Sequence, residues 1–134
     1  MRIAVAGFLV IVSIALFVSL QCTAKATSQA SVAASPYLIE RVANKDWLLI
    51  DVRSPQEFAE GHIPGAVNMP HENINDYLSE LEGHKNKPII IYCRSGRRAK
   101  LAMKVLEDLD FSEVMHLEGD MLGWSAAGMT VDRM

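Results

Sequence analysis

Short apolar runs alternate along this chain with longer stretches in which apolar residues recur every third or fourth position. The runs at 47–50, 66–69, 89–92 and 113–117 have the length of β-strands, and those at 47–50 and 89–92 are apolar throughout. The stretches at 36–44, 55–58, 74–81, 101–109 and 121–124 have the spacing of amphipathic helices. Strands that are apolar on both faces and alternate with helices predict an α/β fold with a mainly parallel sheet, covered by helices on each side.

Capping residues mark where several of these helices begin. Ser35 and Ser54 each stand directly before a proline, which fits the first turn of a helix. Glu57 follows Ser54 by three residues, and this spacing predicts a capping box. For the helix at 74–81 we expect Asn73 or Asn75 as the N-cap and the next glycine as the end.

The first 26 residues differ in kind from the rest of the chain. Arg2 is followed by an uncharged, largely apolar stretch at 3–20, and Ala24-Lys25-Ala26 then matches the small-residue pattern of a cleavage site. This order predicts a secretory signal peptide over residues 1–26, cleaved after Ala26. The alternative is an uncleaved membrane anchor, because the apolar stretch is just long enough to span a bilayer. The small residues inside the stretch and the site behind it favour cleavage.

The remainder divides into a tether at 27–35 and one domain at 36–134. The tether is rich in serine and alanine and has no apolar periodicity, a composition typical of a flexible linker. Export from a bacterial cell would place the domain in the periplasm. An uncleaved leader would instead anchor it to the inner membrane, facing the periplasm.

The charge of the chain argues against nucleic acid as a partner. The full chain carries a net charge of −3, and removal of residues 1–26 would leave 11 basic residues against 16 acidic ones. An acidic domain of this kind repels a polyanion. Basic residues nevertheless gather in one short stretch, which indicates a local site for a small anion: Arg94, Arg97, Arg98, Lys100 and Lys104. The two lysines fit a solvated helix face equally well.

The two cysteines of the chain are Cys22 and Cys93. Cleavage of the leader would leave Cys93 without a partner for an internal disulfide, which indicates a reactive thiol or an intermolecular bridge. The opposite interpretation is a buried, inert thiol. One thiol cannot build a cysteine-based metal site. The four histidines show no ligand spacing either, so we expect no metal: His62, His71, His84 and His116.

Cys93 stands where an apolar strand gives way to a helix. The residues that follow it, Arg94-Ser95-Gly96-Arg97-Arg98, form a short loop and the start of that helix. Parallel strands deliver such a residue to the carboxyl edge of the sheet, where open α/β folds bind ligands. Loop N–H groups, the positive end of the helix and the arginines all favour an anion and a thiolate. Gly96 gives the loop the freedom to turn tightly.

Three motifs resemble the rhodanese-homology family of sulfurtransferases. They are Cys93-x-x-Gly96-x-Arg98, the stretch at 50–68 with Asp51-Val52-Arg53 and Gly61-His62-Ile63-Pro64-Gly65, and Leu117-Glu118-Gly119 with Trp124 and Gly128. They occur in the order and at the spacing of the family, across about residues 36–131. The resemblance implies a three-layer α/β/α sandwich of the rhodanese type, with a mainly parallel central sheet of about five strands. One domain behind an export leader resembles the periplasmic phage-shock type of rhodanese.

The resemblance also implies a function. It implies a thiosulfate sulfurtransferase that works through a persulfide on Cys93, without a metal or organic cofactor. The sulfur would come from thiosulfate or a polysulfide and pass to cyanide, a thiol or a thiol redox protein. The loop residues would bind the substrate: Arg94, Ser95, Gly96, Arg97 and Arg98. Asp51 and Arg53 would support the site structurally, and His62 would belong to the framework instead of acting as a general base.

Two other functions remain open from the sequence. Cys-loop phosphatases carry Cys-x5-Arg, whereas Arg98 gives Cys-x4-Arg here, and the shorter loop leaves less room for a phosphate. The second alternative is a persulfide carrier or redox-partner module. Two departures from the family pattern leave room for it: Asp120 replaces a second glycine after Gly119, and Thr130 replaces the proline before Val131. Both lie outside the cysteine loop and concern C-terminal packing and partner contacts.

Overall fold

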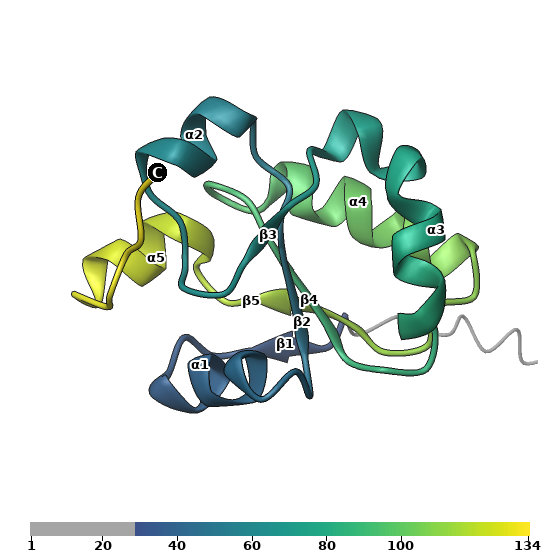
Figure 1. Cartoon of the computed structure of the whole chain (residues 1–134), viewed down its shortest axis with the longest axis horizontal. Coiled ribbons are helices and arrows are strands. Elements are labelled where there is room, and N and C mark those ends of the chain that lie inside the picture. Colours follow the sequence, from purple (N-terminus) through teal and green to yellow (C-terminus); the bar gives the residue numbers. More distant parts are fainter. Residues whose placement is uncertain (1–28) are drawn as a thin grey trace, which may run out of the picture.

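A computed structural model describes residues 29–134, which form a five-stranded sheet between two layers of helices (Figure 1). The strand order is β1-β5-β4-β2-β3, and all neighbouring strands are parallel. The predicted α/β/α sandwich is therefore confirmed. In chain order the strands are β1 (Ser31–Val32), β2 (Leu48–Asp51), β3 (Val67–Asn68), β4 (Ile89–Tyr92) and β5 (Val114–Leu117). The central strand β4 is buried at all four residues, as its apolar sequence predicts.

Helices cover both faces of the sheet. One face packs against α4 and the helical segment before it, and the other against α1 and α5 (Figure 1). Neighbouring residues of a strand point to opposite faces, so Ile89 and Ile91 belong to the first core cluster and Ile90 and Tyr92 to the second. The helices are α1 (Pro36–Ala43), α2 (Pro55–Glu60), α3 (Leu78–Leu81), α4 (Arg97–Asp108) and α5 (Asp120–Ala126), with 3-10 segments η1 (His71–Tyr77) and η2 (Glu82–His84).

The predicted helix starts at the two serines are confirmed. The Ser35 hydroxyl accepts a hydrogen bond from the Leu38 N–H at the start of α1. At the start of α2, the Ser54 hydroxyl accepts from the Glu57 N–H at 3.2 Å, and the Glu57 carboxylate accepts from the Ser54 N–H at 3.0 Å. This reciprocal pair is the predicted capping box, and it fixes where the Glu57 side chain points.

The segment between β3 and β4 differs from its prediction. The residues expected to form one α-helix instead form η1, the single-turn α3 and η2 in succession. Neither Asn73 nor Asn75 is the N-cap, and Gly83 lies inside η2 instead of ending the helix. Short polar side chains such as asparagine compete for the backbone groups of a helix, and this disfavours a regular α-helix here. The apolar spacing still buries Ile74 and Leu81, as the amphipathic pattern predicts.

Part of the predicted tether is an ordered strand. Ser31 and Val32 form β1, which pairs in parallel with β5 at the edge of the sheet. The Glu118 N–H donates to the Val32 carbonyl at 2.9 Å, and the Ser31 hydroxyl donates to the Glu118 carboxylate at 2.7 Å. A strand of two residues is too short to show an apolar period, so composition alone mistakes it for a linker. The predicted signal peptide at 1–26 lies outside the described residues. In residues 29–134 no helix is long and apolar enough to span a membrane.

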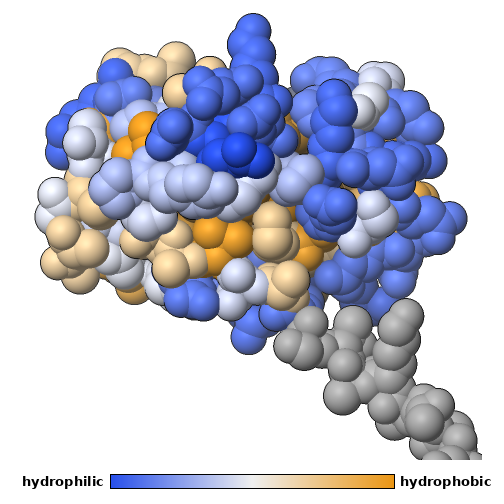
Figure 2. Space-filling view, turned by 90° about the horizontal axis from the view of Figure 1, so that it is seen from below, coloured by the Kyte–Doolittle hydropathy of each residue, from blue (hydrophilic) through white to orange (hydrophobic). Residues whose placement is uncertain are grey.

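One face of the molecule exposes a group of apolar residues (Figure 2). In the view from below, apolar residues gather in the middle of the face and hydrophilic residues cover its right-hand part (Figure 2). A cavity of about 440 Å³ lies between α1, β2 and β3, and its lining includes Val42, Trp47 and Val67. Leu48, at the amino end of β2, also lines it, so this cavity lies at the sheet edge opposite Cys93.

Candidate active site

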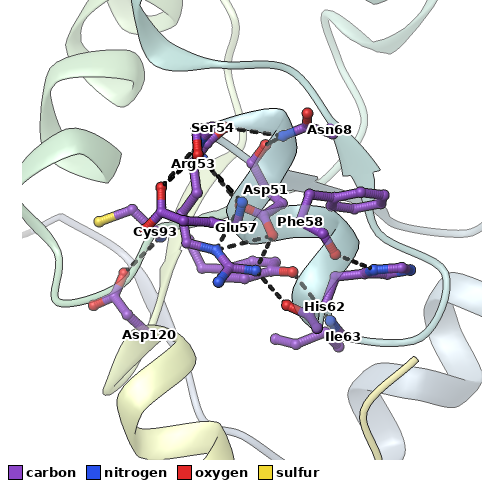
Figure 3. A network of polar contacts seen from close by, with 12 residues as sticks. Asp51, Arg53, Ser54, Glu57, Phe58, His62, Ile63, Asn68, Cys93 and Asp120 are labelled. Carbon is purple, nitrogen blue, oxygen red and sulfur yellow. Dashed lines mark hydrogen bonds and ion pairs between the residues drawn. The ribbon is translucent and has the colours of Figure 1, made fainter. Parts of the chain in front are cut away.

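The carboxyl end of β4 places Cys93 at the centre of the sheet edge, as predicted. Cys93 is a free thiol in a residue that is 2% exposed, and its sulfur points away from Asp51 and Arg53 (Figure 3). The Gly96 N–H donates a hydrogen bond to Cys93 Sγ at 3.0 Å. Gly96 is the N-cap of α4 and has a φ of +114°, a conformation that glycine adopts freely. The sulfur therefore faces a backbone donor at the positive end of the longest helix of the described residues.

The loop residues predicted to bind substrate differ in exposure. Three of them are exposed, Gly96 is buried and Arg98 is half-buried; the exposed ones are Arg94, Ser95 and Arg97. Backbone N–H groups of the first turn of α5 donate to the carbonyls of Cys93 and Arg94 at 2.9 and 3.2 Å. These bonds hold the start of the loop against α5, while the exposed arginine side chains remain accessible to an anion in solution.

Arg98 forms a two-pronged ion pair with Glu57 of α2. Its two terminal nitrogens donate to the two carboxylate oxygens at 2.7 and 2.9 Å, and the side chains are 23% and 30% exposed. A planar guanidinium and a carboxylate match in this way, which fixes the orientation of both groups. The sequence identifies Glu57 only as a capping residue. Its contact with Arg98 joins positions 41 residues apart and has no local signal.

This ion pair leads to a prediction on acid stability. The Arg98 hydrogen bonds, opposed by burial and aided by those from Ser54, lower the pKa of Glu57 from 4.5 to about 2. Since the folded-state pKa is the lower one, the pair stabilises the fold above about pH 4.5, and this is lost as the pH falls towards 2. We expect Glu57→Gln to lower the free energy of unfolding at pH 7 by about 1–2 kcal/mol.

Urea denaturation at pH 7, 4 and 2 checks this prediction. Between the last two pH values the unmodified protein should lose more stability than Glu57→Gln, which has no carboxylate to protonate. The matched control is Glu82→Gln, because Glu82 pairs with Lys85 at 3.2 Å on the surface with its side chain 66% exposed. This control should behave as the unmodified protein does. Parallel stability curves for Glu57→Gln and the unmodified protein would contradict the assignment.

Asp51 and Arg53 form a buried ion pair behind the loop. Asp51 is 0% and Arg53 6% exposed, and the guanidinium donates to the carboxylate through two nitrogens at 2.6 to 3.1 Å (Figure 3). Burial alone lowers the pKa of Arg53, but the hydrogen bonds and charge of Asp51 outweigh it and leave this pKa above its ordinary value. Arg53 also donates to the Gly61 carbonyl at 2.7 Å. The pair thus ties the end of β2 to the chain after α2.

Tyr92 and His62 complete this framework. The Tyr92 hydroxyl accepts from the Ile63 N–H at 3.1 Å, and the Arg53 guanidinium lies 5.8 Å from the Tyr92 ring centroid. Burial, together with the charge of Asp51, raises the pKa of Tyr92 well above its ordinary value, so the hydroxyl stays neutral. His62 stacks on Phe58 at 3.7 Å, and its Nδ1 lies 2.8 Å from the Phe58 carbonyl. These contacts agree with a framework role for His62.

Two residues near the loop were not assigned to the site from sequence. Asp120, noted only as a departure from the family pattern, is buried and accepts a hydrogen bond from the Cys93 N–H at 3.0 Å. His116 Nε2 lies 2.9 Å from the same carboxylate oxygen. The four-residue spacing of His116 and Asp120 could have indicated that the two side chains meet. It does not predict that both lie against Gly96 of the cysteine loop. Within residues 29–134, no three His, Cys, Asp or Glu side chains are grouped to hold a metal ion.

Two cavities flank α2, one beside each end of the loop. The first has a volume of about 310 Å³ and is lined by residues that include Arg94, Leu122 and Arg133. The second has a volume of about 220 Å³ and is lined by residues that include Arg98 and His71. Each cavity therefore has a loop arginine in its wall, together with acidic residues: Glu57 and Glu60 in the first and Glu72 in the second.

Comparison with known proteins identifies the family. The model of the rhodanese-like domain matches residues 35–127. This chain belongs to the rhodanese-like family. The domain is 36% identical over 98 residues to a sulfurtransferase of Allochromatium vinosum. The aligned residues cover 72% of this chain and 90% of that protein. It is 32% identical over 89 residues to the thiosulfate sulfurtransferase GlpE of Pseudoalteromonas translucida, across 66% of this chain and 83% of that protein.

Solved structures agree with this assignment. The rhodanese-like domain superimposes on a thiosulfate sulfurtransferase from Pseudomonas aeruginosa with a TM-score of 0.70 and 27% identity, covering 78% of this chain and 20% of that longer one. It superimposes on a rhodanese-related protein from Thermoplasma volcanium with a TM-score of 0.66 and 27% identity. This superposition covers 78% of this chain and 99% of the other one. The predicted family and fold are therefore confirmed, and the named relatives support sulfur transfer as the general activity. Cleavage after Ala26 and export to the periplasm stay predictions.

Proposed function

We propose that this rhodanese-like domain is a thiosulfate sulfurtransferase that carries the transferred sulfur as a persulfide on Cys93. The observation that carries the proposal is the 3.0 Å hydrogen bond from the Gly96 N–H to Cys93 Sγ at the start of α4. A backbone donor and a helix N-terminus stabilise a negative charge at the sulfur. The same groups stabilise the anionic persulfide, because its charge lies one S–S bond further out in the same loop.

The reaction proceeds in two balanced half-reactions. The Cys93 thiolate attacks the outer sulfur of thiosulfate, a new S–S bond forms, and the S–S bond of thiosulfate breaks. Sulfite leaves with the electron pair of that bond. In the second half-reaction, cyanide or a thiolate attacks the outer sulfur of the persulfide, and the Cys93 thiolate leaves. The enzyme is therefore modified between two substrates, which predicts ping-pong kinetics.

The loop arginines divide between two roles in this proposal. Arg94 and Arg97 are exposed and available to contact the sulfonate oxygens of the donor. Arg98 already shares its terminal nitrogens with Glu57, so it contributes a fixed, partly compensated positive charge beside the loop. Ser95 lies exposed between the two halves of the loop, and Gly96 supplies the backbone donor.

The proposed partners follow from this charge pattern. Small sulfur-containing anions, thiosulfate or a polysulfide, are the proposed donors, and cyanide, a thiol or a thiol redox protein is the proposed acceptor. The leader pattern at 1–26 supports the periplasm as the place of reaction. With an uncleaved leader the same domain would act at the periplasmic face of the inner membrane.

Intact-mass measurement tests the proposal directly. After treatment with thiosulfate and removal of the excess, we expect the purified protein to gain the mass of one sulfur atom. Addition of cyanide should then remove this mass and release an equal amount of thiocyanate. A stable persulfide that neither cyanide nor thiols discharge would favour the carrier alternative. No mass gain, together with hydrolysis of an aryl phosphate, would favour the phosphatase alternative and overturn sulfur transfer.

A further inference from the structure

Asp120 occupies a position that a side chain rarely takes. It is the first residue of α5, its φ is +53°, and the residue is 2% exposed. The left-handed region is disfavoured for residues with a Cβ atom, although aspartate tolerates it better than most. A carboxylate is also costly to bury unless hydrogen bonds and a partner charge compensate it. The contacts of the Asp120 side chain show how this conformation and this buried carboxylate are tolerated.

The Asp120 carboxylate contacts the backbone of the nucleophile itself. Its Oδ1 accepts the Cys93 N–H at 3.0 Å and lies 2.9 Å from His116 Nε2 (Figure 3 shows the side chain reaching from α5 to Cys93). The last residue pair in the register of β4 and β5 is Ile91 with His116, so Cys93 lies beyond the paired part of these strands. The carboxylate thus supplies an acceptor for the buried N–H of Cys93, the first residue after β4.

The same two side chains also lie against the turn of the loop. A Cβ atom built on Gly96 would lie 3.1 Å from Asp120 Oδ2 and 3.5 Å from His116 Cε1. Gly96 is the residue whose N–H donates to Cys93 Sγ. One pair of side chains therefore meets the loop at two points: it bonds the N–H of residue 93 and packs beneath residue 96.

We propose that Asp120 and His116 are a positioning pair for sulfur transfer, which anchors the Cys93 loop so that the Gly96 N–H stays aimed at the sulfur. Neither side chain contacts the substrate in this role. The inference rests on the proposed function, because a fixed donor matters when charge moves from the thiolate to the persulfide and back. A donor held in place before the reaction needs no reorganisation during it.

The test compares two substitutions at Asp120. Asp120→Gly suits the positive φ but removes the acceptor, whereas Asp120→Asn keeps an oxygen that can accept from Cys93 N–H. For Asp120→Gly we expect the rate of persulfide formation at saturating thiosulfate to fall about tenfold, while the half-saturating concentration changes less than about twofold. Asp120→Asn should stay within about threefold of the unmodified protein in this rate. Thermal unfolding followed by circular dichroism shows that each variant is folded.

Asp110→Gly is the matched control, because Asp110 also has a positive φ, +66°, and lies exposed in the turn after α4. It should leave the rate unchanged. A readout that needs no activity is amide hydrogen exchange of Cys93, which should accelerate at least about tenfold in Asp120→Gly but not in the control. Equal rates and equal exchange in Asp120→Gly and the unmodified protein would overturn the pair, and so would an equal loss in Asp120→Asn. If the unmodified protein forms no persulfide, the proposed function fails, and the exchange result still decides whether Asp120 anchors the loop.

Discussion

Cys93→Ser should abolish the transfer of sulfur from thiosulfate to cyanide and leave the domain folded. The nucleophile must be an anion near neutral pH, and a serine hydroxyl does not ionise in this range as a thiol does. The single Gly96 N–H at 3.0 Å from Sγ is not enough to create an alkoxide. We expect thiocyanate formation to fall by about a thousandfold or more. The oxygen fits the space of the sulfur, so the free energy of unfolding should change by less than about 1.5 kcal/mol.

A colorimetric thiocyanate assay and urea denaturation measure these two effects separately. The control is Lys104→Ala, which removes an exposed charge of α4 that pairs with Asp108 and not with the loop. It should retain full turnover, which shows that a substitution on the exposed face of the neighbouring helix does not by itself impair sulfur transfer. Turnover of Cys93→Ser comparable to that of the unmodified protein would place the nucleophile elsewhere and overturn the assignment of Cys93.

Asp51→Ala should produce the largest loss of stability of any substitution in the framework of the site. It leaves the buried guanidinium of Arg53, a residue that is 6% exposed, without its carboxylate partner and close to the Tyr92 ring. Removal of one member of a buried ion pair costs about 3–5 kcal/mol, because the remaining charge has lost its compensation. The change also removes the acceptor of the Arg53 N–H at 2.9 Å, so β2 loses the bond that shapes its end.

Urea denaturation at neutral pH checks this value. The matched control is Asp108→Ala, which breaks an ion pair with Lys104 whose side chains are 72% and 65% exposed. The control should change the free energy of unfolding by less than about 1 kcal/mol, because solvent screens an exposed pair. A loss below about 1 kcal/mol in Asp51→Ala would show that the buried pair does not hold the framework together.

The two ion pairs beside the loop illustrate how unevenly a sequence reveals its contacts. Asp51 and Arg53 are two positions apart at the end of an apolar strand, so their contact is local, and the resemblance already assigned both to structural support of the site. Glu57 and Arg98 pair across 41 positions, and only the packing of α2 beside the start of α4 brings them together. The capping box is local and correctly places the Glu57 backbone at the start of α2. It says nothing about the second partner of the carboxylate.

Asp120 is a second residue whose role in the candidate site depends on a contact that the local sequence does not reveal. Its sequence neighbours place it at the start of a short helix, where an acidic residue is ordinary. What makes it part of the site is the contact with the Cys93 N–H, 27 positions earlier in the chain. A pattern of apolar residues predicts which face of an element is buried. It does not predict which polar group a buried side chain will meet.

The sequence by itself determined the α/β architecture, the central strand at 89–92, the capped starts of α1 and α2, and the cysteine loop. Each single element depends on residues within one turn or one strand of each other, and the architecture follows from the alternation of these elements along the chain. Only the tertiary structure decided that residues 31–32 add an edge strand, that Glu57 holds Arg98, and that Asp120 holds Cys93. These features depend on hydrogen bonds between segments far apart in the chain. Such bonds form only after the sheet and its helices have packed, so no local pattern encodes them.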